Sequence, residues 1–352
     1  RRQDARRRQA NCRGGPDAKL RRDRPDLVCP SHGEVMRSPQ RELAALWRRL
    51  KSLVYDLALR HWDKDDNPYL SCAVSDLTDT AGLRRVSQHI FKLEASNCYI
   101  LLADNGHALF LDCGLGGEAG RQLLDRVIHA MRSRYGLRQI DAVNISHYHG
   151  DHLSQVPYLR EKYGAQVWCY ENMVEVMERP ERFNLTCLNM AYGFPFAGIS
   201  IDRALREGEV VDFHGLRLKA VHLPGQTLYA MALVADIDGR RIVFTDDNIF
   251  HSASQSGHDA FIARNRGILE QGYIKCADRL AEIDPDLILG QHAQEIPKPR
   301  RQIEQMVEWS REFRRALKRL SCFDEYEYFI DPYWVELYPY RNEGAAGESF
   351  TL

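Results

Sequence analysis

The sequence lacks the long apolar run that a membrane-spanning helix requires. No stretch approaches the roughly 18–20 consecutive apolar residues that cross a bilayer, and no secretory apolar core follows the arginine-rich first residues. The sequence therefore predicts no membrane span, and we expect no membrane partner.

Paired cysteines are also missing. The nine cysteines include no CxxC pair and are scattered along the chain. This scatter argues against a disulfide framework and is typical of reduced, mostly buried thiols. We therefore expect a cytoplasmic protein.

Net charge is close to absent, because 48 basic side chains balance 49 acidic ones to leave a formal charge of −1. This balance argues against a dedicated nucleic-acid-binding surface, so we expect a small-molecule substrate and no nucleic-acid partner. A chain of 352 residues with 44% hydrophobic content is large enough for one large domain with extensions, or for two domains. Nothing in the sequence indicates an oligomeric state.

A segment near the beginning of the sequence resembles one near its end at a shift of 260 positions, from His32 to His292. Pro25-Asp-Leu-Val-Cys-Pro-Ser-His32 corresponds to Pro285-Asp-Leu-Ile-Leu-Gly-Gln-His292, and a helical pattern follows each copy. A repeat at this distance predicts a duplicated domain. We interpret residues 1–61 as the end of a preceding, truncated copy, which would make this chain the C-terminal part of a tandem protein. A coincidental similarity is the alternative.

The remaining sequence divides into a polar linker, an α/β domain and an aromatic extension, over residues 62–85, 86–320 and 321–352 respectively. Within the domain, turn residues at 104–106 and 238–239 predict two β-hairpins. Apolar residues at helical spacing predict helices at 118–135, 156–163 and 300–320, and further strands are predicted at 140–146, 166–170 and 216–221. Hairpins alternating with helices favour two mixed sheets sandwiched between helices.

Residues 147–152 read His-Tyr-His-Gly-Asp-His and place four potential metal ligands in six positions, directly after an apolar strand. On an extended backbone, His147 and His149 point to the same side. Gly150 lets the chain turn, so that Asp151 and His152 can face a second point nearby. Such a density of ligands has no structural reason without a metal.

This motif resembles the His-x-His-x-Asp-His hallmark of the metallo-β-lactamase superfamily, and the resemblance extends over roughly residues 86–320. Leu111-Asp-Cys-Gly114 is similar to the family's early Asp-x-Gly turn, which places Asp112 beneath the metals. Phe244-Thr-Asp-Asp247 resembles Thr-Gly-Asp, which makes Asp247 the bridging carboxylate, and Gly290-Gln-His292 resembles the segment of the late histidine ligand. The resemblance implies an αββα sandwich with two metal ions at one edge of the sheets.

One position departs from the family pattern. Where relatives carry Thr-Pro-Gly-His-Thr, this chain has Leu-Pro-Gly-Gln-Thr227, so Gln226 stands at the third ligand of the first metal. An amide oxygen binds zinc more weakly than imidazole does. Gln226 could ligate weakly, His222 could replace it or support a ligand from behind, or the first site could be weakened while Asp151, His152, Asp247 and His292 keep the second intact.

The resemblance implies a hydrolase whose cofactor is zinc, two ions per chain, with iron or manganese as alternatives. Zinc would supply hydroxide at neutral pH for attack on an ester, thioester, lactone or related bond. Asp151 would orient the nucleophile and move its proton, and Asp112 would hold a ligand histidine by its ring N–H. The alternatives are an iron-dependent persulfide dioxygenase, a nuclease and a degenerate scaffold domain.

Overall fold

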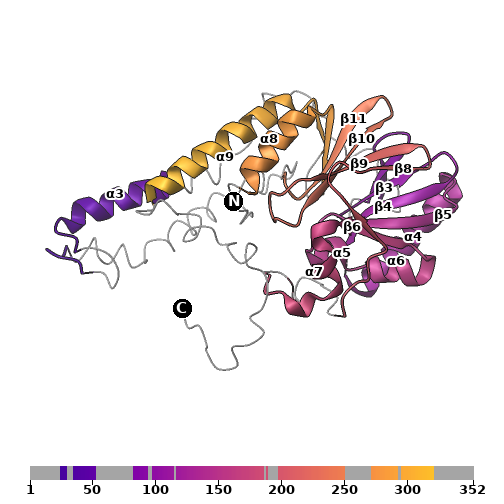
Figure 1. Cartoon of the computed structure of the whole chain (residues 1–352), viewed down its shortest axis with the longest axis horizontal. Helices are drawn as coiled ribbons and strands as arrows, with labels where there is room; N and C mark the ends of the chain where they lie inside the picture. The colour runs from indigo at the N-terminus through magenta and orange to yellow at the C-terminus, as the bar shows by residue number, and fades with distance from the viewer. Residues whose placement is uncertain are drawn as a thin grey trace.

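The computed structural model describes residues 24–29, 35–52, 82–93, 97–114, 116–185, 188, 197–249, 271–291 and 295–320. Within these ranges two β-sheets face each other, and helices cover their outer sides (Figure 1). The predicted αββα sandwich is therefore confirmed.

The first sheet has seven strands in chain order. Its strands β1 to β4 pair antiparallel and β4 to β7 pair parallel. The bounds are β1 (Leu83–Arg85), β2 (Ile90–Leu93), β3 (Asn97–Leu102), β4 (His107–Gly114), β5 (Gln139–Ile145), β6 (Gln166–Tyr170) and β7 (Arg203–Leu205). Strand β1 lies inside the expected linker, because the buried Leu83 gives it a core contact. The domain therefore begins before residue 86, and residues 62–81 lie outside the described ranges.

The second sheet has six strands, in the order β13-β12-β11-β10-β9-β8. Only β11 and β12 pair parallel among these neighbours. The bounds are β8 (Val210–Phe213), β9 (Leu216–His222), β10 (Met231–Ile237), β11 (Arg240–Asp246), β12 (Leu287–Gly290) and β13 (Ile296–Pro297). Both predicted hairpins, β3–β4 and β10–β11, are present with their turns at 104–106 and 238–239.

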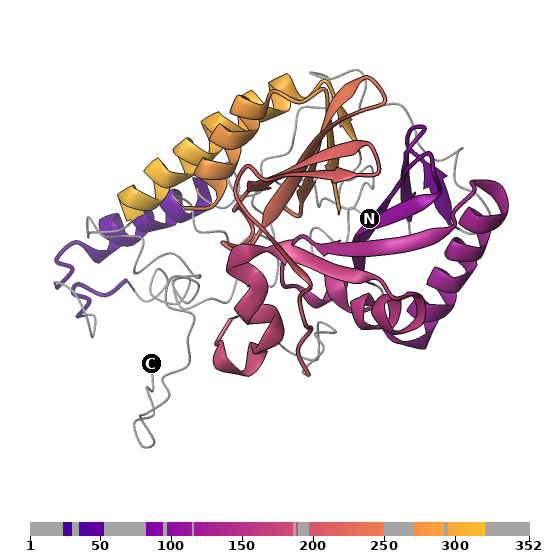
Figure 2. The same ribbon diagram turned by 45° about the vertical axis from the view of Figure 1, so that its right-hand side comes forward.

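Helices cover the outer side of each sheet (Figure 2). Against the first sheet lie α4 (Gly117–Arg134), α6 (Val156–Tyr163) and α7 (Val174–Glu178), and against the second lie α8 (Tyr273–Ile283) and α9 (Arg300–Leu320). The stripe predicted for α4 is buried, including Leu124, Val127 and Met131. Each such side chain contributes about 1.5–3 kcal/mol on burial. None of the helices in the described ranges combines the length and apolar character of a membrane span.

The unit near the beginning of the chain has the same strand register as its counterpart near the end. An antiparallel bridge joins Val28 to Met36, and β12 pairs with β13 through Ile288 and Ile296, which lie 260 positions further along. A helix follows each pair, α3 (Pro39–Lys51) in the first case and α9 in the second, and the two helices are in contact. This shared register supports the duplication, which stays a proposal.

His89 links the two sheets at the edge where β10 turns into β11. Its Nδ1 lies 2.6 Å from an Asp238 oxygen and its Nε2 lies 3.0 Å from Asp104. Burial acts to lower the pKa of His89, but hydrogen bonds to these two carboxylates raise it above 6.5 overall. The protonated ring therefore stabilises the fold fully below pH 6.5, and this contribution is lost as the pH rises through the higher folded pKa.

We therefore expect His89→Gln to lower the free energy of unfolding by about 0.5–1 kcal/mol at pH 6 and by less at pH 9. Urea unfolding at both pH values measures this difference. His129→Gln, on the exposed side of α4, is the matched control. An equal loss at both pH values would contradict the assigned charge of His89.

Candidate metal centre

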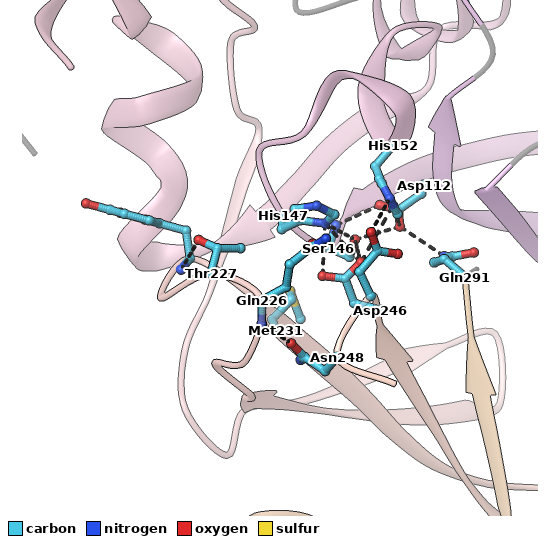
Figure 3. A network of polar contacts seen from close by, with 12 residues as sticks. Asp112, Ser146, His147, His152, Gln226, Thr227, Met231, Asp246, Asn248 and Gln291 are labelled. Atoms are coloured by element: carbon cyan, nitrogen blue, oxygen red, sulfur yellow. Dashed lines mark hydrogen bonds and ion pairs between the residues drawn. The ribbon is translucent and has the colours of Figure 1, made fainter. Parts of the chain in front are cut away.

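The candidate site lies where β4, β5, β11 and β12 end at one edge of the sandwich. Because β4 and β5 run parallel, as do β11 and β12, their carboxyl ends meet there. Asp112 lies near the end of β4 and Asp246 ends β11. The His147–His149 loop follows β5 and leads into the short helix α5 (Gly150–Leu153), which carries Asp151 and His152. The elements of the two sheets thus bring together side chains far apart in sequence (Figure 3).

Gly114 allows the ligand loop to lie directly on β4. A Cβ atom at this position would stand 1.5 Å from the carbonyl oxygen of Asp151, which is backbone and cannot move aside alone. Gln155 then donates its N–H to the carbonyl of Cys113 at 2.9 Å. The loop is therefore fixed to the strand that carries Asp112.

Three imidazoles form the centre of the site. The ring centroid of His147 lies 4.3 Å from that of His149 and 4.2 Å from that of His152. His147 and His152 are fully buried, and His149 is partly exposed. The three histidine rings of the motif therefore lie around one point, as the rings of metal ligands do.

Asp112 holds the base of this cluster. Its Oδ2 lies 3.0 Å from His152 Nδ1 and accepts hydrogen bonds from Ser146 Oγ at 2.6 Å and Gln291 Nε2 at 2.9 Å. Its Oδ1 accepts the Ser146 N–H at 2.7 Å. The carboxylate therefore fixes the ring of His152 by the nitrogen that faces away from the centre.

A second carboxylate, Asp246, does the same for His147 and was not anticipated from the sequence. One of its oxygens lies 2.9 Å from His147 Nδ1 and 2.8 Å from Ser146 Oγ. Its backbone is left-handed, with φ of 59°. The family pattern Thr-Gly-Asp has glycine here, which adopts this conformation readily, and that departure was the available signal.

Asp247 and Asp151 lie on the other side of His152. Asp247 Oδ2 is 3.2 Å from His152 Nε2, and Asp151 Oδ2 is 3.7 Å from the same nitrogen. The Asp247 side chain is buried, whereas that of Asp151 is 43% exposed. Of these two carboxylates, only that of Asp151 is accessible to solvent and therefore to a bound substrate.

Gln226 approaches from the second sheet, and its side chain extends toward His147 (Figure 3). Its N–H donates to Asn248 Oδ1 at 2.9 Å, and Asn248 Nδ2 donates to the carbonyl of Leu223 at 2.6 Å. A Cβ at Gly225 would stand 2.1 Å from Asn248 Oδ1, so glycine permits this packing. The buried Asn248, also missed by sequence reasoning, therefore positions the loop of Gln226.

His222 does not join the cluster. Its Nε2 lies 2.8 Å from the carbonyl oxygen of Leu228, and its ring stacks on Tyr170 at 5.3 Å. The expectation that His222 replaces Gln226 or supports a ligand is therefore corrected, because the end of β9 turns this ring toward Tyr170. His292 lies outside the described residues; its neighbour Gln291 contacts Asp112, as described above.

Burial and charge set opposite protonation states within the cluster. Burial, together with the charge of His152, lowers the pKa of His147 to about 4, and burial likewise lowers that of His149. Burial alone would lower the pKa of His152, but the charge of Asp247 and the hydrogen bond to Asp112 raise it well above 6.5. Burial raises the pKa of Asp246 to about 7. His147 and His149 are therefore neutral at pH 7, the form in which imidazole binds metals.

Two buried polar atoms without hydrogen-bond partners in the described ranges indicate that the site suits a metal. His147 Nε2 and Gln226 Oε1 are buried and have no hydrogen-bond partner within the described part of the chain. An unpaired buried polar atom costs about 1–3 kcal/mol, which coordination would offset. Among the described residues, His147 can share one ion with His149 and Asp247, or with His152 and Asp246. The donor set fits zinc, with imidazole nitrogens and carboxylate oxygens.

Comparison with known proteins agrees with this arrangement. Residues 92–292 match the family model described as the metallo-beta-lactamase superfamily. A probable metallo-hydrolase of Burkholderia pseudomallei (strain 1710b) is 25% identical over 131 residues, which cover 37% of this chain and 40% of that protein. The chain thus matches less than half the length of that relative.

Two solved structures share the fold. A metallo-beta-lactamase of Cronobacter sakazakii with a HARLDQ motif has a TM-score of 0.50 at 19% identity, covering 70% of this chain and 92% of that one. A metallo-beta-lactamase family protein of Thermus thermophilus also has a TM-score of 0.50 at 19% identity, covering 64% and 78%. These likenesses establish the architecture and carry no information on substrate.

Proposed function

Because this chain belongs to the metallo-beta-lactamase superfamily, we propose that it is a metal-dependent hydrolase acting on an ester, thioester, lactone or related bond. The observation that carries the proposal is the pair of neutral imidazoles, His147 and His149, at a buried centre with the unpaired His147 Nε2. Buried neutral imidazoles beside carboxylates are a zinc-binding arrangement.

Two zinc ions are the proposed cofactor. His147, His149 and Gln226 would hold the first ion, and Asp151, His152 and His292 would hold the second. Asp247 would bridge the two, since its carboxylate faces His152 and groups with His147 and His149. When bound, the zinc ions lower the pKa of a water molecule to about 7 and so supply hydroxide at neutral pH.

The chain's own residues orient the reaction. Asp112 and Asp246 hold His152 and His147 by Nδ1, so each ring presents Nε2 to the centre without rotational freedom. The partly exposed carboxylate of Asp151 would accept a proton from the attacking water and return it to the leaving group. Gln226 presents a neutral amide, so the first zinc would carry one imidazole fewer than the family pattern provides.

Metal removal tests the proposal directly. We expect the purified chain to hold about two zinc equivalents at this centre, to lose hydrolysis of an ester, thioester and lactone panel after chelation, and to regain it with zinc. Elemental analysis under anaerobic purification provides the metal content. One iron per chain, with no hydrolysis, would favour the persulfide dioxygenase instead, and a chain that binds no transition metal after reconstitution would refute the hydrolase.

A further inference from the structure

A second group of metal-type ligands lies at the opposite edge of the sandwich. His107 begins β4, Asp141 lies near the start of β5, and His214 lies in the turn between β8 and β9. His107 and Asp112 are five residues apart on one strand, which separates the two groups by roughly 17 Å. This group is therefore independent of the proposed hydrolytic centre.

The three side chains converge on the carboxylate of Asp141. His107 Nδ1 lies 2.9 Å from both of its oxygens, and His214 Nε2 lies 2.5 Å from Oδ2. The two imidazole rings are 4.3 Å apart, and the three ligand atoms all lie within 4.8 Å of one another. Side chains from both sheets thus point at one location.

These separations are close to those of a tetrahedral zinc site. Bonds of about 2.0–2.2 Å at tetrahedral angles place neighbouring ligand atoms about 3.3 Å apart, so the two histidine nitrogens would each move away from the Asp141 oxygens by less than 1 Å. The side chains of His107, Asp141 and His214 are 29%, 21% and 33% exposed. The partial exposure leaves room for a water molecule as the fourth ligand.

Neighbouring groups hold the ligand on the second sheet in place. His214 has a left-handed backbone with φ of 51°, and the next residue, Gly215, donates its N–H to Asp212 Oδ1 at 2.7 Å. Asn105 lies 3.0 Å from His214 Nδ1, the ring nitrogen that faces away from Asp141. The carboxamide oxygen of Asn105, Oδ1, accepts the backbone N–H of His107 at 3.1 Å. Asn105 therefore contacts the backbone of one histidine and the ring of the other.

We propose that His107, Asp141 and His214 form a zinc site that fastens the β8–β9 hairpin of the second sheet to β4 and β5 of the first. Two imidazoles and one carboxylate, with water in the fourth position, are the donors that zinc takes. A bound ion would replace the hydrogen bonds between two partly exposed rings and a carboxylate with three metal bonds across the sheets. The role is structural, and it does not depend on the activity of the main centre.

The test uses the full chain with its hydrolytic centre weakened by Asp247→Ala. We expect Asp247→Ala to hold about one zinc equivalent more than Asp247→Ala with His214→Asn. Zinc binding at this site should raise the melting temperature of the Asp247→Ala protein by about 5 °C. The double variant that also carries His214→Asn should lack this rise. Asparagine tolerates the left-handed conformation of residue 214, so the turn is preserved.

His129→Asn, which removes an exposed histidine on α4, is the matched control and should change neither quantity. The His214→Asn protein could melt at a lower temperature even without zinc. In that case zinc content and the zinc-dependent rise in melting temperature are measured for His107→Gln in the Asp247→Ala background instead. Equal zinc content and equal zinc-dependent stabilisation with and without these histidines would overturn the site, and would leave the hydrolase proposal untouched.

Discussion

Replacing Asp247 with alanine is expected to lower zinc binding by about one equivalent and the catalytic efficiency of hydrolysis by about a thousandfold or more. The reason is geometric. Its buried carboxylate lies 3.2 Å from His152 Nε2 and groups with His147 and His149, which is why we propose that it contacts both ions. Its loss would remove a ligand from each ion and leave His152 beside fewer negative charges.

Zinc content by elemental analysis and kcat/KM on the preferred ester, thioester or lactone measure the two effects. Asp236→Ala is the matched control, because it removes a carboxylate that is 79% exposed on the adjacent strand β10. Asp247→Asn separates the effect of the negative charge from that of the side-chain volume, since the amide keeps the volume and removes the charge. Unchanged zinc content in both variants would show that Asp247 does not bridge the metals.

The sequence predicts the main elements because their signals are local. The apolar stripe of α4 and the turns of both hairpins depend on residues within one element, and the structure contains them all. Short strands such as β7 and β13 carry no comparable pattern, because two or three residues cannot display a period. Their pairing is decided by the neighbouring strand.

The same distinction applies to the site. The spacing of His147, His149 and His152 identifies a metal loop, because the ligands are neighbours in sequence. Asp246 was missed because its replacement of the family glycine marks an unusual position but does not say which side chain it contacts. Its contact with His147 spans 99 positions and depends on a left-handed residue at the end of β11. The expectation for His222 was wrong for the same reason, since the ring direction depends on Tyr170 from the other sheet.

Asp246 and Gln226 are two departures from the family pattern in the same half of the centre. Gln226 offers a weaker ligand than imidazole, while Asp246 adds a carboxylate 2.9 Å behind His147. A carboxylate in this position raises the basicity of a ligand imidazole. We therefore propose that Asp246 compensates for Gln226 by making His147 a stronger ligand of the first zinc.

This compensation predicts opposite effects of two substitutions. Asp246→Asn is expected to weaken zinc binding at the first site about 10–100-fold, the usual cost of losing such a partner, whereas Gln226→His is expected to strengthen it. In the double variant, the imidazole supplied by Gln226→His should reduce the penalty of Asp246→Asn. Zinc affinities from competition with a chelator give this double-mutant cycle.

Asp284→Asn is the control for the effect of an Asp-to-Asn change at a left-handed position. Asp284 also has a left-handed backbone, with φ of 45°, and lies at the exposed end of α8. This variant should bind zinc as the unmodified chain does. Equal zinc affinity of the Asp246→Asn protein and the unmodified chain would mean that Asp246 serves the packing around Ser146 rather than the metal. Independent, additive effects of the two substitutions would likewise show that Asp246 and Gln226 act separately, because compensation requires that the penalty at one depend on the residue at the other.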